Sequence, residues 1–192
     1  MNLVMILATG FEELEAVGTA DVLARLGITV TFAGLDSIKI TGSHNMTIAA
    51  HHKLADLSVS DYDGVILPGG LPGATNLEES ADVQKAIDFA NDNGKYICAI
   101  CAAPQILGHK GLLDGKEAIA YPGFESELRG AEISEEYVVL DGDTPLLTKQ
   151  SMPEITGVAV VAMGVSPQTE YEIIKLLSAL FDLPSNRISI TK

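Results

Sequence analysis

The chain has 192 residues, 47% of them hydrophobic, and carries 26 acidic against 12 basic side chains. Its net charge of −14 argues against nucleic acids and anionic membrane surfaces as partners, because both bind mainly through basic groups. No apolar run approaches the roughly 18 residues of a membrane span, and the N-terminal segment lacks a signal-peptide pattern, so a cytoplasmic protein is expected.

Strands and helices are predicted to alternate along the first 113 residues. Continuous apolar runs indicate strands that are covered on both faces. The predicted strands are residues 3–8, 28–33, 63–67 and 96–100, with short strands within 38–50. The predicted helices are residues 12–26, residues 80–91 and a helix from Cys101 to about Leu113. This alternation predicts an α/β sandwich with a mostly parallel sheet.

The last part of the chain has a different pattern. A hairpin is predicted from strands 136–140 and 144–148, followed by a strand at 157–163. A helix at 166–181 and a strand at 187–191 complete the prediction. Residues 1–140 hold 20 acids and 8 bases, whereas residues 141–192 hold 6 acids and 4 bases, which indicates a change in the chain near residue 140.

Cys101 lies where an apolar strand gives way to a predicted helix. This strand–turn–helix pattern is typical of an exposed nucleophile. The helix N-terminus is expected to lower the pKa of the thiol and to offer N–H donors to an oxyanion. The alternative is that Cys101 is simply a small buried residue. Cys98 is predicted to be a core residue, because within a strand it lies about 10 Å from Cys101, too far for a disulfide.

Acidic residues and glycines supply further candidates. Glu12, Glu13 and Glu15 follow the first strand, so they are expected at the same edge of the sheet as Cys101. A carboxyl group buried near a thiol has a raised pKa and can move a proton. For Glu12 and Glu13, the favourable effect of acids at a helix N-terminus is the simpler explanation. Gly69 and Gly70 allow backbone N–H groups to approach the same crevice.

No metal site and no cofactor site is predicted. His51 and His52 are adjacent, and neither has the spacing from the cysteines that zinc ligands require. His44 and His109 are predicted to be surface or hydrogen-bonded residues. No phosphate-binding or dinucleotide-binding fingerprint is present.

Four motifs in order resemble the ThiJ/PfpI superfamily, specifically its DJ-one-like branch. They are LATGFEELEAV (7–17), VILPGGLPGATNL (65–77), AICAAP (99–104) and YPGFE (121–125). The resemblance implies a flavodoxin-like three-layer sandwich, similar to class I glutamine amidotransferases, for residues 1–142. It implies that Cys101 is a reactive cysteine on a nucleophile elbow and that Glu15 hydrogen-bonds its thiol.

The resemblance also implies the rest of the site and its chemistry. Gly70 and Ala102 correspond to the backbone donors of the oxyanion pocket, with Gly69 and Tyr121 beside them. Tyr121 stands where some relatives have a histidine, which argues against a Cys-His dyad and hence against a protease. The implied activity is cofactor-independent conversion of reactive aldehydes, of the glyoxalase III or protein deglycase type. The implied substrate is a small aldehyde or a glycated molecule, and the implied assembly is a homodimer.

Two other functions remain open from the sequence. One is a redox-sensing or chaperone-like stress protein in which Cys101 is oxidised. The other is a non-catalytic assembly protein. Residues 143–192 depart from the superfamily pattern and resemble the C-terminal segment of the stage III sporulation protein AG. They predict a fusion or engineered chimera, in which a β-α-β segment of a ring-building motif replaces the C-terminal strand and helix and packs onto the first domain. The alternative is that this segment forms a small semi-independent appendage.

Overall fold

The computed structural model describes residues 1–135, 139–141 and 158–160. Their strands are β1 (Asn2–Leu7), β2 (Thr29–Gly34), β3 (Lys39–Thr41), β4 (Thr47–Ala49), β5 (His52–Lys53), β6 (Gly64–Leu67), β7 (Tyr96–Ala99), β8 (Glu117–Ala118), β9 (Glu132–Ile133), β10 (Val139–Asp141) and β11 (Val158–Val160). Their α-helices are α1 (Glu13–Arg25), α2 (Gly73–Glu79), α3 (Ala81–Asp92) and α4 (Pro104–His109). Single 3₁₀ turns are η1 (Leu54–Asp56), η2 (Val59–Asp61) and η3 (Glu125–Glu127).

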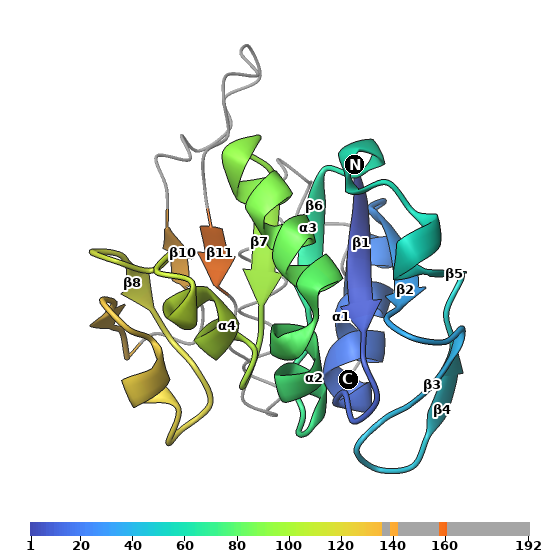
Figure 1. The fold of residues 1–192 in the computed structure, drawn as a ribbon, viewed down its shortest axis with the longest axis horizontal. Helices are drawn as coiled ribbons and strands as arrows, with labels where there is room; N and C mark the ends of the chain where they lie inside the picture. Colours follow the sequence, from blue (N-terminus) through green and yellow to red (C-terminus); the bar gives the residue numbers. More distant parts are fainter. Residues whose placement is uncertain (136–138, 142–157, 161–192) are drawn as a thin grey trace.

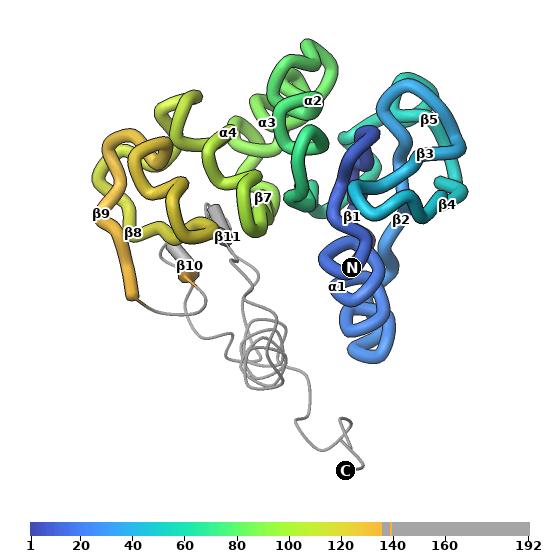
Figure 2. The backbone as a smooth tube through the Cα atoms, turned by 90° about the horizontal axis from the view of Figure 1, so that it is seen from below, coloured from blue at the N-terminus to red at the C-terminus, as the bar shows by residue number. Residues whose placement is uncertain are grey.

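A seven-stranded sheet forms the centre of the fold, in the order β10-β11-β7-β6-β1-β2-β5. All its pairings are parallel except the antiparallel pair β10–β11. Helix α1 covers one face of this sheet, and helices α2, α3 and α4 cover the other (Figures 1 and 2). The predicted flavodoxin-like sandwich with a mostly parallel sheet is therefore confirmed.

Strand β1 shows why the continuous apolar runs predicted the sheet correctly. Leu3 and Met5 pack into the cluster that contains Leu23 of α1, whereas Val4 and Ile6 pack into the cluster on the opposite face. All four side chains are at most 1% exposed. Because successive side chains in a strand point to opposite faces, a strand between two helical layers must be apolar at every position.

The strand predicted at 157–163 is present as β11, whose residues pair in parallel with β7. Strand β10 pairs with β11, and the partner strand 144–148 predicted for it lies outside the described residues. The helix predicted at 166–181 and the strand at 187–191 lie outside them as well. The division of the chain at residue 142, and with it the β-α-β replacement segment, stays a prediction.

Helix α4 is shorter than predicted and begins three residues after Cys101. Its last residue, His109, hydrogen-bonds Glu78 of α2 through Nδ1, and its Nε2 lies 2.8 Å from Glu127 Oε2 of η3. These two carboxylates raise the pKa of His109, although burial opposes the shift. His109 is therefore a partnered residue that ties α4 to two neighbouring elements, one of the alternatives that the sequence left open.

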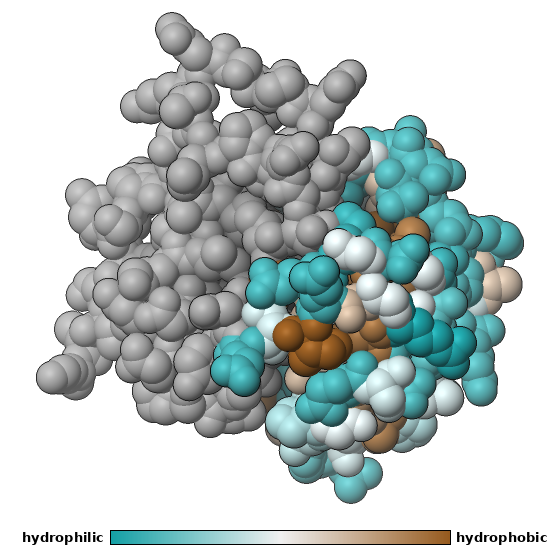
Figure 3. All heavy atoms as spheres, turned by 90° about the vertical axis from the view of Figure 1, so that its left-hand side faces the viewer, coloured by the Kyte–Doolittle hydropathy of each residue, from teal (hydrophilic) through white to brown (hydrophobic). Residues whose placement is uncertain are grey.

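Two surface features complete the fold. On the side where β8 and β9 lie, apolar side chains gather within a largely hydrophilic described surface (Figure 3). A cleft of about 470 Å³ lies elsewhere, between the η1–η2 segment and α3, and residues such as Leu57 and Phe89 line it. Among the described residues, no helix has the length and apolar character to cross a membrane.

Candidate functional site

Cys101 lies in the turn that leaves β7, with a φ of 62°. A non-glycine residue at positive φ is uncommon, and such strain is typical of functional sites. The prediction that Cys101 starts a helix was wrong, because α4 begins only at Pro104. The backbone oxygen of Cys101 accepts a hydrogen bond from the Tyr121 backbone N–H at 2.8 Å, so the segment at Tyr121 lies beside the turn.

Two other segments of the chain, and the residue after Cys101 itself, contact the Cys101 sulfur. The Glu15 side chain hydrogen-bonds it from α1, and the backbone N–H groups of Gly70 and Ala102 contact it from two loops. Strands β1, β6 and β7 are neighbours in the sheet, and each is followed by one of these groups. The structure thus brings Cys101, Glu15, Gly70 and Ala102 together, whereas Tyr121 reaches Cys101 through its backbone and has a side chain that is 53% exposed.

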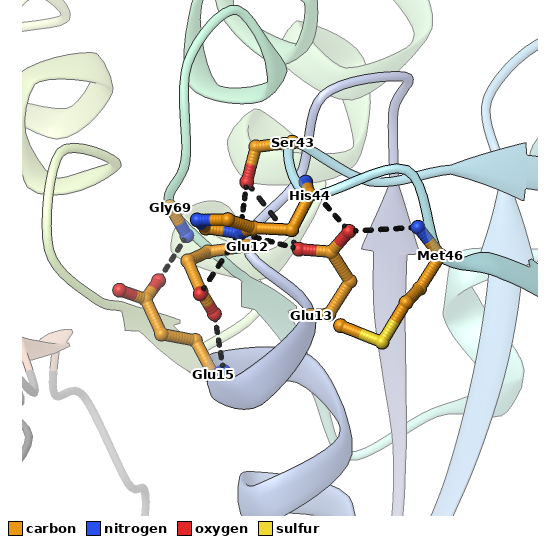
Figure 4. Close-up of polar contacts among 7 residues, drawn as sticks. All are labelled: Glu12, Glu13, Glu15, Ser43, His44, Met46 and Gly69. Carbon is orange, nitrogen blue, oxygen red and sulfur yellow. Dashed lines mark hydrogen bonds and ion pairs between the residues drawn. The ribbon is translucent and has the colours of Figure 1, made fainter.

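Glu15 is a buried carboxyl group, 6% exposed. Its Oε2 accepts a hydrogen bond from the Gly69 backbone N–H at 2.9 Å (Figure 4). Burial raises the pKa of Glu15 to about 6, since it outweighs the hydrogen bonds from Cys101 and Gly69, and the nearby charge of Glu12 adds to the increase. A carboxyl group with this pKa exchanges its proton near neutral pH.

The thiol of Cys101 has a pKa of about 12, raised first by burial and then by the charge and hydrogen bond of Glu15. The N–H groups of Gly70 and Ala102 oppose this shift but do not outweigh it. The prediction of a lowered thiol pKa was therefore wrong, because burial outweighs the two N–H donors. Protonation of Glu15 removes the repulsion between its carboxylate and the sulfur, whereas the effect of burial, the largest cause, remains.

Gly69 and Gly70 make the close approach possible. A Cβ at Gly69 would lie 2.7 Å from the Cys101 Cβ and 2.8 Å from Glu15 Oε2. Gly70 has a φ of 87°, and a Cβ there would overlap the backbone N of Glu12. A side chain at either position would therefore collide with the segments that surround Cys101. The catalytic roles of the site residues stay predictions.

A second carboxylate, Glu13, holds the hairpin of β3 and β4 against the start of α1. Its Oε1 accepts hydrogen bonds from the backbone N–H groups of His44, at 2.8 Å, and Met46, at 3.2 Å (Figure 4). The His44 Nδ1 lies 3.1 Å from Glu13 Oε2, and Ser43 Oγ donates to the same oxygen at 3.3 Å. Glu13 is 3% exposed, so the favourable effect of an acid at a helix N-terminus does not by itself explain this buried carboxylate.

We expect Glu13→Gln to destabilise the chain by about 2 kcal/mol at neutral pH, because a neutral amide accepts hydrogen bonds less strongly than a carboxylate. Burial opposes ionisation, yet the hydrogen bonds from the loop lower the pKa of Glu13 to about 2. Because its pKa is lower in the folded state, ionised Glu13 stabilises that state at pH values above its ordinary pKa of 4.5. This stabilisation is lost as the pH falls toward about 2.

Urea unfolding at neutral and at acid pH measures this effect. The difference between wild type and Glu13→Gln should shrink as the pH falls through that window. Glu79→Gln, at an exposed position on α2, is the control and should leave the unfolding midpoint unchanged. Equal stability of Glu13→Gln and wild type at neutral pH would contradict the assigned role of Glu13.

Among the described residues, the three groups whose geometry suits a metal ion are Glu12, Glu13 and His44, with ligand atoms within 4.8 Å of one another. Hydrogen bonds hold this group together, and we assign no metal to it.

Cys98 lies within β7, and burial raises its pKa to about 12. Cys98 was predicted to be a core residue, and it is partly buried against the apolar cluster on the α1 face.

The chain is similar to known proteins of one family. A family model described as the DJ-1/PfpI family matches residues 1–161. The Drosophila melanogaster protein named Protein dj-1beta is 37% identical over 142 residues, which are 72% of this chain and 76% of that protein. The protein named Deglycase PH1704, from Pyrococcus horikoshii, is 30% identical over 149 residues, covering 74% of this chain and 87% of its own.

Solved structures give the same result. The crystal structure of Drosophila melanogaster DJ-1beta matches with a TM-score of 0.75 and 33% identity, over 93% of this chain and 89% of the other. The family match extends past residue 142, where the sequence predicts the first domain to end.

Proposed function

The chain belongs to the DJ-1/PfpI family, and from this membership we propose that it is a cysteine-dependent enzyme that converts reactive aldehydes without a cofactor. The observation that carries the proposal is the hydrogen bond between Glu15 and the Cys101 thiol, with two backbone N–H groups at the sulfur. Three archaeal relatives that are 30% identical to the chain are named deglycases, which supports a glycated or aldehyde substrate.

The first step is attack of the Cys101 sulfur on the aldehyde carbon. As the S–C bond forms, the thiol proton passes to Glu15 and the C=O electron pair moves onto the oxygen. The N–H groups of Gly70 and Ala102 lie next to the sulfur, where they favour its anionic form as the thiol proton leaves. Glu15 then gives this proton to the oxygen, which completes a hemithioacetal and restores the carboxylate.

The second step moves a proton between two carbons of the hemithioacetal. Glu15 removes the proton from the carbon bound to sulfur, and the electron pair of that C–H bond forms an enediolate. The proton returns to the neighbouring carbon while the hydroxyl proton passes to the oxygen on that carbon, which converts the hemithioacetal into a thioester. Water then hydrolyses the thioester, which releases a 2-hydroxy acid and restores the thiol. For methylglyoxal the product is lactate, and the substrate plus one water balances the product without an external oxidant.

We expect Glu15→Gln to reduce lactate formation from methylglyoxal by about 10²-fold or more, since an amide neither accepts nor returns the proton. The measurement is kcat/KM for lactate production by wild type and variant. In wild type the rate should fall as the pH drops below about 6, because Glu15 is then already protonated. Asp21→Asn, an exposed position on the same helix, removes the same charge and should retain the wild-type rate.

A Glu15→Gln variant with the wild-type kcat/KM would rule out this mechanism.

The homodimer stays a prediction of the family resemblance.

A further inference from the structure

Glu12 contacts the Cys101 site through both its backbone and its side chain. Its backbone N–H donates to the Gly69 oxygen at 2.9 Å, and its Oε2 accepts from the Glu15 backbone N–H at 3.0 Å. Gly69 in turn donates its own N–H to the Glu15 carboxylate. The three residues therefore close a ring of hydrogen bonds, and Glu12 lies between Glu15 and the hairpin loop in Figure 4.

Glutamate is an unusual choice for the position that Glu12 occupies. Glu12 is the N-cap of α1, where serine, threonine, aspartate and asparagine are the residues that ordinarily accept the hydrogen bond. A longer side chain loses more rotamer freedom when it is fixed in one geometry. Local rules of this kind are most often broken at functional sites, which suggests that Glu12 does more than cap the helix.

The charges around Glu15 come from three elements. Cys101 faces it from the turn after β7, and Glu12 adjoins it at the start of α1. On the far side of Glu12, the Nδ1 of His44 in the hairpin loop lies 3.6 Å from Glu12 Oε1. After burial, which is the largest cause, the negative charge of Glu12 adds to the raised pKa of Glu15. A negative neighbour of Glu15 favours its protonated form.

We propose that Glu12 is a positioning residue that orients Glu15 toward Cys101 and, through its charge, favours the state in which their shared proton lies on Glu15. In that state the sulfur is a thiolate and the Glu15 carboxyl is neutral. The inference rests on the proposed function, because it concerns the thiol that this function uses as its nucleophile.

The test is the pH dependence of Cys101 alkylation by iodoacetamide, followed by peptide mass spectrometry so that Cys98 is counted separately. Glu12→Gln and Glu12→Ser both keep an oxygen that accepts the capping hydrogen bond and remove the charge. At neutral pH we expect both to react about threefold to tenfold more slowly than wild type, equivalent to a shift of about 0.5 to 1 pKa unit. Glu12→Asp keeps the charge and should remain within about twofold of wild type.

Asp21→Asn is the matched control, because it removes one exposed acid from the same helix and should leave the alkylation profile unchanged. Wild-type profiles in both Glu12→Gln and Glu12→Ser would overturn the proposal, since Glu12 would then only cap the helix. A loss in Glu12→Asp equal to that in Glu12→Ser would overturn it too, because charge would not be the cause.

Alkylation needs no turnover, which separates this inference from the proposed function. If the chain forms no lactate but the Glu12 variants alkylate slowly, the inference holds and the proposed function fails. If lactate forms and the variants alkylate as wild type does, the proposed function holds and the inference fails.

Discussion

Cys101→Ser is expected to lower kcat/KM for lactate formation from methylglyoxal by at least about 10³-fold. The proposed reaction begins when a sulfur anion attacks the aldehyde, and Glu15, with a pKa of about 6, accepts the proton from a thiol. A serine hydroxyl holds its proton far more tightly, so the same carboxylate removes it much less readily. The measurement is lactate production under saturating and limiting substrate.

Stability and a matched cysteine variant complete the test. Serine is nearly isosteric with cysteine, so the thermal midpoint of Cys101→Ser should stay close to that of wild type. Cys98→Ala removes the other thiol, which lies within β7, and should keep kcat/KM within about threefold because Cys98 forms no part of the reaction. Full activity in Cys101→Ser would remove the nucleophile from the proposed mechanism.

Gly70→Ala is expected to destabilise the chain by about 3 kcal/mol and to abolish turnover. Part of this cost is backbone strain, since Gly70 has a φ of 87°, a conformation that disfavours a residue with a Cβ. The remainder comes from overlap, because the new Cβ would lie 2.7 Å from the Gly10 oxygen and against the backbone of Glu12. Any relief of this overlap moves the Gly70 N–H away from Cys101. Urea unfolding and lactate production measure the two effects.

Gly18→Ala is the control for Gly70→Ala and is expected to stabilise the chain rather than destabilise it. Gly18 lies in the interior of α1 and a Cβ there meets no atom within 4 Å. Alanine is the better helix former, so this variant should be stabilised by about 0.5 to 1 kcal/mol. If Gly70→Ala unfolds at the same urea concentration as wild type, the close packing of Gly70 against the Glu12 segment is refuted.

The sequence predicted the sheet well and the helices less completely. Strand β1 and strand β6 were recognisable because burial on both faces requires apolar residues throughout. Helix α2 was not predicted, because its seven residues carry no side-chain cap. The extent of α4 was overestimated, because the apolar residues that follow Cys101 suit a turn as well as a helix.

The site could be predicted in part. The positions of Cys101 and Glu15 followed from the rule that parallel strands end at one edge of the sheet. The contact between Glu13 and His44 could not be foreseen, because it joins residues 31 positions apart and depends on how the hairpin folds back. The only signal in the sequence is the pair of consecutive acids, Glu12 and Glu13, at the start of the helix. The positive φ of Cys101 leaves no trace in the sequence.

Strand β11 has a consequence for shortened forms of the chain. Its three residues pair with the outer side of β7, the strand that leads directly into Cys101, and also provide the partner of β10. A chain that ends at residue 142 would leave one side of β7 unpaired, with its N–H and C=O groups open to a strand from another molecule. Self-association through β-strand pairing would then begin at the strand next to the reactive thiol.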